Sequence, residues 1–147
     1  MNHLFLVKSA QWTVNGHLFD KNKDFKQVKG LITVSWKREK WFDMKTQLSL
    51  GKSDSQDIVA KSKGHFDNQG KSYSYVLKHN VLGNIEGEGF LNLESITQYY
   101  WLVSSSQRCL GVDNFYRIDE NTYHLSSLFL ESHNFESNME ATLKLFK

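Results

Sequence analysis

The sequence predicts an all-β protein, a single antiparallel up-and-down barrel of about ten strands with at most one short N-terminal helix. From about Trp12 onward, segments of roughly ten residues with strand character alternate with turns. Evenly spaced short strands without intervening helices protect their edges best by closing into a barrel. The composition agrees, because 14% of the residues are aromatic and none is proline. Aromatic side chains favour strands, and the turns must therefore depend on Gly, Asn and Asp.

A chain of 147 residues has room for one substantial core, so residues 1–147 are predicted to form a single barrel domain. Residues 3–10 form either a short helix or a lead-in strand, because their apolar residues show no clear period. The polar stretch 20–26 is expected to be a loop. The predicted strands are residues 11–19, 28–36, 41–50, 57–66, 72–79, 84–91, 95–104, 109–118, 122–130 and 135–146.

The first hairpin, between strands 28–36 and 41–50, is compatible with two registers. A two-residue loop places Trp36 opposite Trp41, as an aromatic pair on the outer face. A loop longer by one residue turns Trp36 inward, beside Phe42.

Alternation of apolar and polar residues assigns the inward face of three strands. The inward residues are Phe42, Met44, Leu48 and Leu50 in the third strand, Ile58, Ala60, Ser62, Gly64 and Phe66 in the fourth, and Met139, Ala141, Leu143 and Leu145 in the last.

Two glycines lie on one face of strand 84–91. Gly87 and Gly89 share that face with Ile85 and Leu91. Glycine inside a strand marks a bend, a bulge or a close approach. We therefore expect either barrel curvature at these positions or room for a ligand above the bare backbone, and the two are compatible.

The strand Ser95–Ser104 is apolar on both faces. Tyr100 and Leu102 lie on one face, and Tyr99 and Trp101 lie on the other, so one aromatic set must be outside the barrel. Large exposed apolar patches usually mark interfaces. The chain has no proline to block a strand edge, and its net charge of +2 is too small to oppose association. We expect a homodimer through this strand. The competing expectation is that residues 4–7 fold back over the patch.

The barrel interior is the predicted place of a ligand, because a barrel of about ten strands leaves more room than a barrel of eight. Several inward phenols in an apolar lumen need partners, which a ligand or a buried water can supply. The residues expected to line this interior are Tyr73, Tyr75, Leu77, Tyr100, Leu102, Tyr123 and Leu125, with His79 on the same face as Tyr73.

This order of features resembles the calycin superfamily: lipocalins, fatty-acid-binding proteins, nitrobindin-like haem proteins and cyanobacterial bilin-lyase-like barrels. The resemblance covers nearly the whole chain and rests on Gln11-Trp12-Thr13-Val14-Asn15-Gly16, the meandering strands and the late strand Met139-Glu140-Ala141-Thr142-Leu143. Lipocalins carry glycine two residues before the tryptophan, where this chain has Ala10, and Gly16 matches the nitrobindin-like glycine only loosely.

The resemblance implies that Trp12 packs near one barrel end against a basic residue from a late strand, here Arg117 or Lys144. It also implies a small ligand in the lumen. The predicted ligand-binding residues are Tyr73, Tyr75, His79, Tyr100, Arg117 and Tyr123.

No catalytic residue is predicted. Glu86 and Glu88 share a strand face about 7 Å apart, but alternation places them in solvent. Ser126 and Ser127 lie beside His124, yet neighbours along a strand point to opposite faces.

No metal site is predicted, because none of the six histidines forms a pair with ligand spacing on one local element. A single histidine can bind haem, as in nitrobindin-like proteins, and His79 and His124 are the best placed. The identity of any cofactor stays open.

Charge and cysteine content exclude other classes of function. Eighteen Lys and Arg oppose sixteen Asp and Glu, and the basic cluster Lys37-Arg38-Lys40 is interrupted by Glu39, so nucleic acid is not an expected partner. Cys109 is alone and permits no internal disulfide. The first residues contain only four consecutive apolar positions, so we expect a cytoplasmic protein without a membrane segment.

Two functions from different classes fit these features. The first is non-enzymatic binding of a small apolar or tetrapyrrole-like ligand in the lumen. The alternative is a structural or protein-interaction barrel whose lumen is filled by its own side chains.

Overall fold

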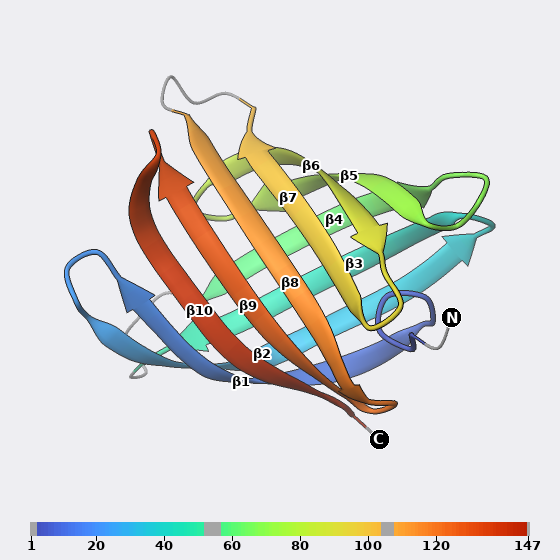
Figure 1. The fold of residues 1–147 in the computed structure, drawn as a ribbon, viewed down its shortest axis with the longest axis horizontal. Coiled ribbons are helices and arrows are strands. Elements are labelled where there is room, and N and C mark those ends of the chain that lie inside the picture. Colours follow the sequence, from blue (N-terminus) through green and yellow to red (C-terminus); the bar gives the residue numbers. More distant parts are fainter. Residues whose placement is uncertain (1–2, 52–56, 104–107, 147) are drawn as a thin grey trace.

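The computed structural model describes residues 3–51, 57–103 and 108–146. Its ten strands form one closed barrel, in which each strand pairs antiparallel with its neighbours in sequence and β1 pairs with β10 (Figure 1). The predicted all-β up-and-down barrel is therefore confirmed. The strands are β1 (Ala10–Asp20), β2 (Phe25–Arg38), β3 (Trp41–Leu50), β4 (Ile58–Phe66), β5 (Ser72–His79), β6 (Gly83–Leu91), β7 (Ser95–Leu102), β8 (Cys109–Asp119), β9 (Thr122–Glu131) and β10 (Asn134–Leu145).

Most strand bounds lie within one or two residues of the predicted bounds, and the largest difference is at the start of β2. Phe25 pairs with Phe19 and Lys26 with Leu18, so the ladder continues into the stretch expected to be a loop. Backbone pairing does not require apolar side chains, and the ring of Phe25 stacks on His17 at 4.6 Å. The predicted turns at 51–55 and 105–108, and the end of the seventh strand at 104, lie largely outside the described residues.

The first hairpin adopts the longer of the two loops. Trp36 pairs with Phe42 and Arg38 pairs with Trp41, so the register shifts between Trp36 and Arg38. This bulge turns the Trp36 ring inward, where it stacks on Phe66 at 5.6 Å and contacts Phe42 at 5.7 Å.

The inward faces assigned to the third, fourth and last strands are confirmed. Phe42, Phe66, Ala141 and Leu143 are each between 0% and 3% exposed. Aromatic rings cover Gly87 and Gly89 of β6, so the expected room for a ligand above these glycines is absent. A side chain at Gly89 would collide with the ring of Tyr73, its direct neighbour on β5. The bare backbone is occupied by aromatic rings from the adjacent strand, and it leaves no room there for a ligand.

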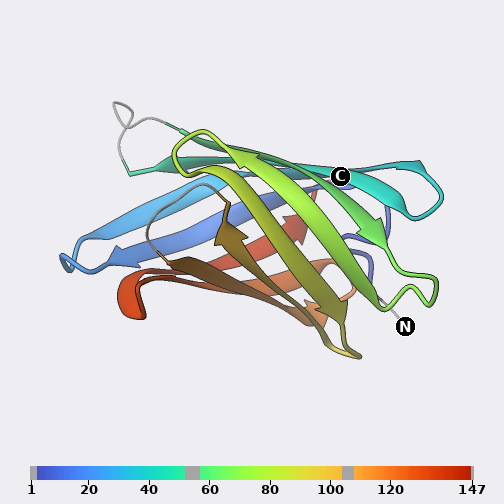
Figure 2. The same cartoon turned by 90° about the horizontal axis from the view of Figure 1, so that it is seen from above.

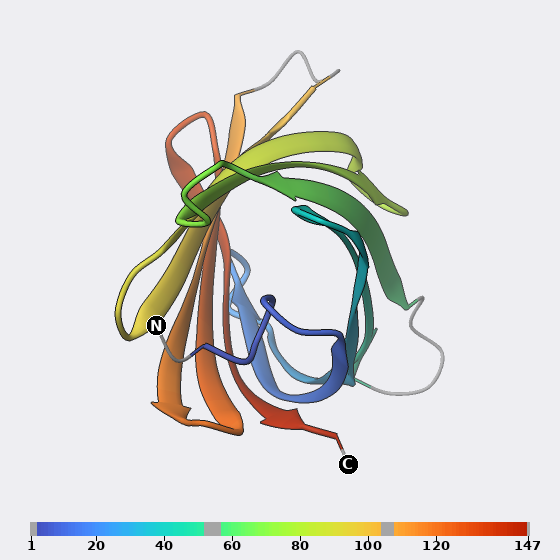
Figure 3. The ribbon, with the colours of Figure 1, turned by 90° about the vertical axis from the view of Figure 1, so that its right-hand side faces the viewer.

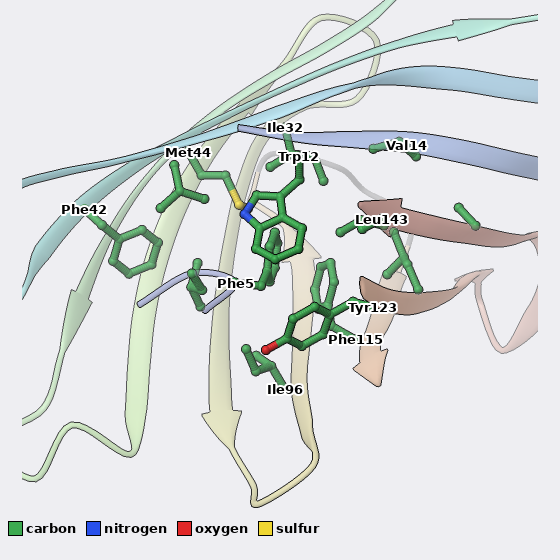
Figure 4. Close-up of a cluster of buried hydrophobic side chains, with 14 of the residues drawn as sticks. Phe5, Trp12, Val14, Ile32, Phe42, Met44, Ile96, Phe115, Tyr123 and Leu143 are labelled. Atoms are coloured by element: carbon green, nitrogen blue, oxygen red, sulfur yellow. The ribbon is translucent and has the colours of Figure 1, made fainter. Parts of the chain in front are cut away.

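The N-terminal segment closes one end of the barrel. Residues 3–9 form turns rather than the expected short helix or strand, and they cross the barrel mouth (Figure 3). Phe5 and Leu6 are 0% and 1% exposed. The Phe5 ring contacts Trp12 at 5.5 Å and Phe115 at 4.7 Å, in a cluster that Tyr123 completes (Figure 4).

Polar contacts hold this segment in place. His3 is 4% exposed, and its Nε2 lies 2.7 Å from the carbonyl oxygen of Asn92, so this nitrogen donates. Its Nδ1 then accepts from the Tyr123 hydroxyl at 2.7 Å. The carbonyl of Leu6 accepts from Trp36 Nε1 at 2.9 Å, although Leu6 has a φ of 74°, a strained backbone for a leucine. These bonds hold the strained turn inside the barrel end.

The place of residues 4–7 also corrects one expectation. They lie inside the barrel end against Trp12 and Tyr123 and do not cover Tyr99 and Trp101 on the outside of β7. Trp101 remains 36% exposed.

The two ends of the barrel differ in packing. Figure 2 shows the barrel from above, with β3 and β4 on one side and β8 to β10 on the other. At the end closed by residues 3–9, inward side chains such as Val34 and Ile96 are at most 1% exposed. At the opposite end the inward side chains keep exposed surface; they include Leu18, Leu50, Leu77, Tyr100, Leu102, Phe129 and Met139. The interior side chains are therefore buried at the end closed by residues 3–9 and partly exposed at the other end, which we call the open end.

Replacing Phe5 by alanine tests the closure of the barrel end. We expect Phe5→Ala to lower the free energy of unfolding by about 3–5 kcal/mol, because it removes a buried ring and leaves a cavity beside Trp12. Urea unfolding followed by tryptophan fluorescence measures the change. Phe146→Ala is the matched control, because Phe146 is 56% exposed. Equal losses in the two variants would contradict a structural role for the N-terminal segment.

Candidate functional site

Two rows of inward side chains cross the middle of the lumen. In the first, strand pairing aligns Tyr73, Gly89, Gln98, Asp113 and Ser127 on β5 to β9. The next row, one pair closer to the open end, aligns Tyr75, Gly87, Tyr100, Gly111 and Phe129. In both rows each tyrosine pairs with a glycine on the next strand. Because glycine has no side chain, the phenol ring extends across that neighbouring strand.

A hydrogen-bonded chain runs along the first row. The Tyr73 hydroxyl donates to Gln98 Oε1 at 2.7 Å, and Gln98 Nε2 donates to Asp113 Oδ2 at 2.8 Å. The Ser127 hydroxyl also hydrogen-bonds to the Asp113 carboxylate. Gln98 is only 5% exposed, and its amide can face only one way between a donor and a carboxylate. The chain therefore holds the carboxylate of Asp113 in a fixed position in the lumen.

Burial changes the ionisation of this group of residues. It raises the pKa of the Asp113 carboxyl above its usual range, while hydrogen bonds from Gln98 and Ser127 act in the opposite direction. Burial, followed by the charge of Asp113, also raises the pKa values of Tyr73, Tyr75 and Tyr100. All three phenols are thus uncharged donors near one carboxyl.

The second row holds a buried phenol, Tyr75, that lacks a hydrogen-bond partner among the described residues. Tyr75 is 6% exposed, and its buried hydroxyl has no hydrogen-bond partner among the described residues. The Tyr100 ring covers Gly111 and stacks on Phe129 at 6.3 Å. Leaving a buried hydroxyl unpaired costs about 1–3 kcal/mol, which a bound polar group can recover. This row faces the part of the lumen where inward side chains keep exposed surface.

The six residues predicted to bind a ligand therefore separate into three places. Tyr73, Tyr75 and Tyr100 gather around Asp113. His79 ends β5 at the open end, where its Nδ1 accepts from the backbone of Val81 and Leu82 at 3.0 and 3.1 Å and burial lowers its pKa.

Tyr123 and Arg117 lie at the closed end. Tyr123 is 0% exposed under the N-terminal segment, and backbone N–H groups of Leu4 and Phe5 also bond to its hydroxyl. Arg117 is its direct strand partner and reaches Glu94 at 3.8 Å. Of the two basic residues expected near Trp12, Arg117 therefore lies beside Tyr123, whose ring contacts Trp12 at 5.5 Å. Lys144 is exposed on the outer face.

Other chemical candidates lie outside the lumen. His124, expected as a possible haem ligand, is on the outer face, with its Nε2 3.3 Å from Glu140 Oε2, so it does not line the lumen. Glu86 and Glu88 are exposed as predicted, and Glu88 accepts from the Tyr99 hydroxyl at 2.6 Å. Within residues 3–51, 57–103 and 108–146, no three His, Cys, Asp or Glu side chains are grouped so as to hold a metal ion. No helix in these ranges has the length and apolar character needed to cross a bilayer.

Sequence reasoning missed Asp113, Gln98 and Ser127. Alternation does carry a signal for the first two, since Asp113 lies two residues from Gly111 and Phe115, and Gln98 lies between Ile96 and Tyr100 on the inward face. A polar residue at an inward position of a barrel strand is thus a better pointer to this site than a histidine at a strand end.

Known structures share this architecture. The S-type phycobiliprotein lyase CPES from Guillardia theta has a TM-score of 0.69 at 8% identity, covering 95% of this chain and 89% of that chain. Rv2717c from M. tuberculosis has a TM-score of 0.70 at 10% identity, covering 95% and 92%. The redesigned β-barrel mFAP0, bound to DFHBI, has a TM-score of 0.50 at 13% identity, covering 92% and 96%.

No family model and no curated protein sequence matches the chain. At such low identities the structural similarity shows the fold alone. The protein has a calycin-like fold, as the sequence resemblance implied.

The Asp113 carboxyl predicts a pH-dependent stability. The pKa of this carboxyl is higher in the folded protein than the usual 3.8 of the unfolded chain. As pH rises, the unfolded chain therefore loses the proton first, and the free energy of unfolding decreases until pH passes the pKa of the folded protein. Asp113→Asn has no such titration. Between about pH 3 and pH 7, the free energy of unfolding of the variant should therefore increase relative to that of the wild type. Urea unfolding at several pH values measures it.

Asp119→Asn is the control with the opposite sign. Backbone and side-chain hydrogen bonds from Asn121 and Thr122 lower the pKa of exposed Asp119 below 3.8. The free energy of unfolding of the wild type should therefore increase relative to that of this variant as pH rises. A difference for Asp113→Asn that stays constant with pH would contradict a raised pKa of the Asp113 carboxyl.

Proposed function

We propose that the protein binds a small, largely apolar molecule in the open half of the lumen, without catalysis, and that tetrapyrrole-like compounds are among the molecules that fit. The observation that carries this proposal is the unpaired Tyr75 hydroxyl, which faces the same interior as the Asp113 carboxyl. The similarity to a barrel bound to DFHBI, mFAP0, supports the use of such a lumen for a small ligand.

The chemistry of the lining indicates how a ligand would be held. Leu77, Leu102 and Met139 supply apolar contact, and the stacked rings of Tyr100 and Phe129 suit a flat conjugated molecule. Asp113 and Tyr75 supply one acceptor and one donor for a polar group. Burial of about 400 Å² of apolar ligand at roughly 25 cal/mol per Å² contributes about 10 kcal/mol, and association costs reduce this to roughly micromolar affinity.

Comparison of native and denaturing mass spectra of the purified protein tests whether a ligand is present. A mass difference that disappears on denaturation supports the proposal. The absence of any difference, together with no binding of added biliverdin, haem or anilinonaphthalene sulfonate, would favour the alternative of a filled structural barrel.

Substitutions in the lumen and on the outer face test which of the two surfaces binds the ligand. We expect Tyr75→Ala and Tyr100→Ala to weaken biliverdin binding about tenfold or more, because each removes contact area and a hydroxyl at an inward position. Glu86→Ala and Glu88→Ala are exposed controls and should change the Kd by less than about twofold. Absorbance titration measures the Kd, and equal losses in all four variants would place binding outside the barrel.

We further propose that the protein forms a homodimer through the outer face of β7, which would also serve a protein-interaction role. Phe90 stacks on Tyr99 at 6.4 Å, and Tyr99 contacts Trp101 at 5.9 Å. Phe90, Trp101 and Leu110 are 44%, 36% and 39% exposed. A continuous aromatic and aliphatic row of this kind is typical of an interface.

Trp101→Glu tests the dimer. We expect the wild type to sediment as a dimer at about 100 μM and the variant to shift toward monomer, because the new carboxylate would be desolvated in the interface. The far-UV circular dichroism of the variant should stay that of the wild type. A wild-type protein that is monomeric at this concentration would refute the dimer.

A further inference from the structure

A positively charged groove lies on the outer face of the barrel, over β2 to β6. Its volume is about 740 Å³. Most of its lining residues, including all of its lysines, lie on the outward side of their strands, where the lysines alternate with Met44, Ser62 and Leu77. These three inward residues and Ile85 also border the groove. These lysines are Lys37, Lys45, Lys61, Lys63 and Lys78.

Three of these lysines stand side by side. Lys45 pairs with Lys61, and Lys61 pairs with Lys78, on three adjacent strands about 4.8 Å apart. Among the described residues, no carboxylate lies within ion-pair distance of any of the three. Lys37, another lysine of this groove, has an acidic partner, Asp43, at 3.9 Å.

Positive charge is concentrated in this groove. Its five lysines face only two lining carboxylates, Asp43 and Glu86, which leaves an excess of three positive charges. The formal net charge of the whole chain is +2. The remainder of the chain is therefore close to neutral or slightly acidic, and the groove is the place where an anion is attracted.

The fold itself gives no reason for three adjacent lysines. Like charges directly opposite each other on neighbouring strands destabilise a sheet. Lysines often protect exposed sheet edges from pairing, but a closed barrel has no such edge in β3, β4 or β5. The repulsion is relieved when an anionic partner occupies the groove.

We propose that this groove binds an acidic, extended segment of a partner protein. The backbone N–H groups of the strands are used in sheet pairing, so recognition depends on ammonium groups, which act as mobile point charges and suit a chain of spaced carboxylates. Val76 and Val103, 56% and 52% exposed, border the groove and provide contact for apolar residues between the acidic ones.

Two features of the lining disfavour nucleic acid as the occupant. None of the described lining residues is aromatic, so nothing in the groove can stack on a base. Asp43 and Glu86 at its sides repel a continuous phosphate backbone. The lysines that would bind this segment lie on the opposite side of the sheet from Tyr75 and Asp113, so this inference does not depend on the proposed lumen ligand.

Fluorescence anisotropy with a labelled peptide of alternating Glu and Val residues tests the groove. The groove variant combines Lys45→Gln, Lys61→Gln and Lys78→Gln. The control variant combines Lys26→Gln, Lys29→Gln and Lys144→Gln, which are exposed lysines outside the groove and give the same net charge. We expect the groove variant to bind the peptide at least about tenfold more weakly than the wild type and the control to stay within about twofold.

A matched peptide of alternating Gln and Val should bind at least about tenfold more weakly to the wild type. Equal binding of the acidic peptide to wild type and groove variant, or equal weakening in both variants, would overturn the proposal. So would a single-stranded oligonucleotide that binds the wild type more tightly than the acidic peptide does.

The same groove variant has a second readout that requires no peptide. Removing three facing charges should raise Tm by about 1–3 °C at low ionic strength, and added salt should reduce this gain. A lower Tm would show that the lysines already have stabilising partners within the chain, and would overturn the argument that an external anion compensates them.

Discussion

The structure depends first on the antiparallel pairing of β1 with β10. This ladder runs from Trp12 paired with Leu145 to Asp20 paired with Ser137, and it converts a twisted sheet into a closed barrel. Gly16 lies in the middle of the ladder, where a side chain would collide with the backbone of Glu140 and Ala141. The close approach of the two strands therefore requires glycine at this position. Without this ladder the barrel would not close around the Phe5 cluster and the row of inward side chains from Tyr73 to Ser127.

The interior is organised by tyrosines that lie over glycines. Tyr73, Tyr75 and Tyr100 each cover the glycine paired with them on the next strand. Because the ring lies along the sheet, its hydroxyl reaches toward a third strand, as Tyr73 does to Gln98. This arrangement brings polar groups to the centre of the lumen while the aromatic rings replace the missing side chains, so the barrel wall is intact where the site is formed.

Most of the fold could be predicted from the sequence, because period-2 alternation and turn residues are local signals. Alternation also assigned Tyr75 and Tyr100 to the inward face. It could not predict how far along the barrel an inward residue lies, so Tyr123, under the N-terminal segment, was grouped with Tyr75. The His3 contact could not be predicted either, because its partners Tyr123 and Asn92 are 120 and 89 residues away. The register at Trp36 was ambiguous because one bulged residue changes the face without changing the composition.

The position of the closing ladder has a consequence for synthesis on the ribosome. β1 ends at Asp20 and its partner β10 begins at Asn134, so one edge of β1 has no partner until the last strand has been translated. At about 5–20 residues per second, translation of the intervening strands takes about 6–23 s. During this interval Trp12 and Val14, later buried, lie on a sheet that is still open. Closure must also overcome the entropy of a long chain loop. The nascent chain is therefore most vulnerable to misassociation just before its final strand emerges, although the completed barrel presents no free edge.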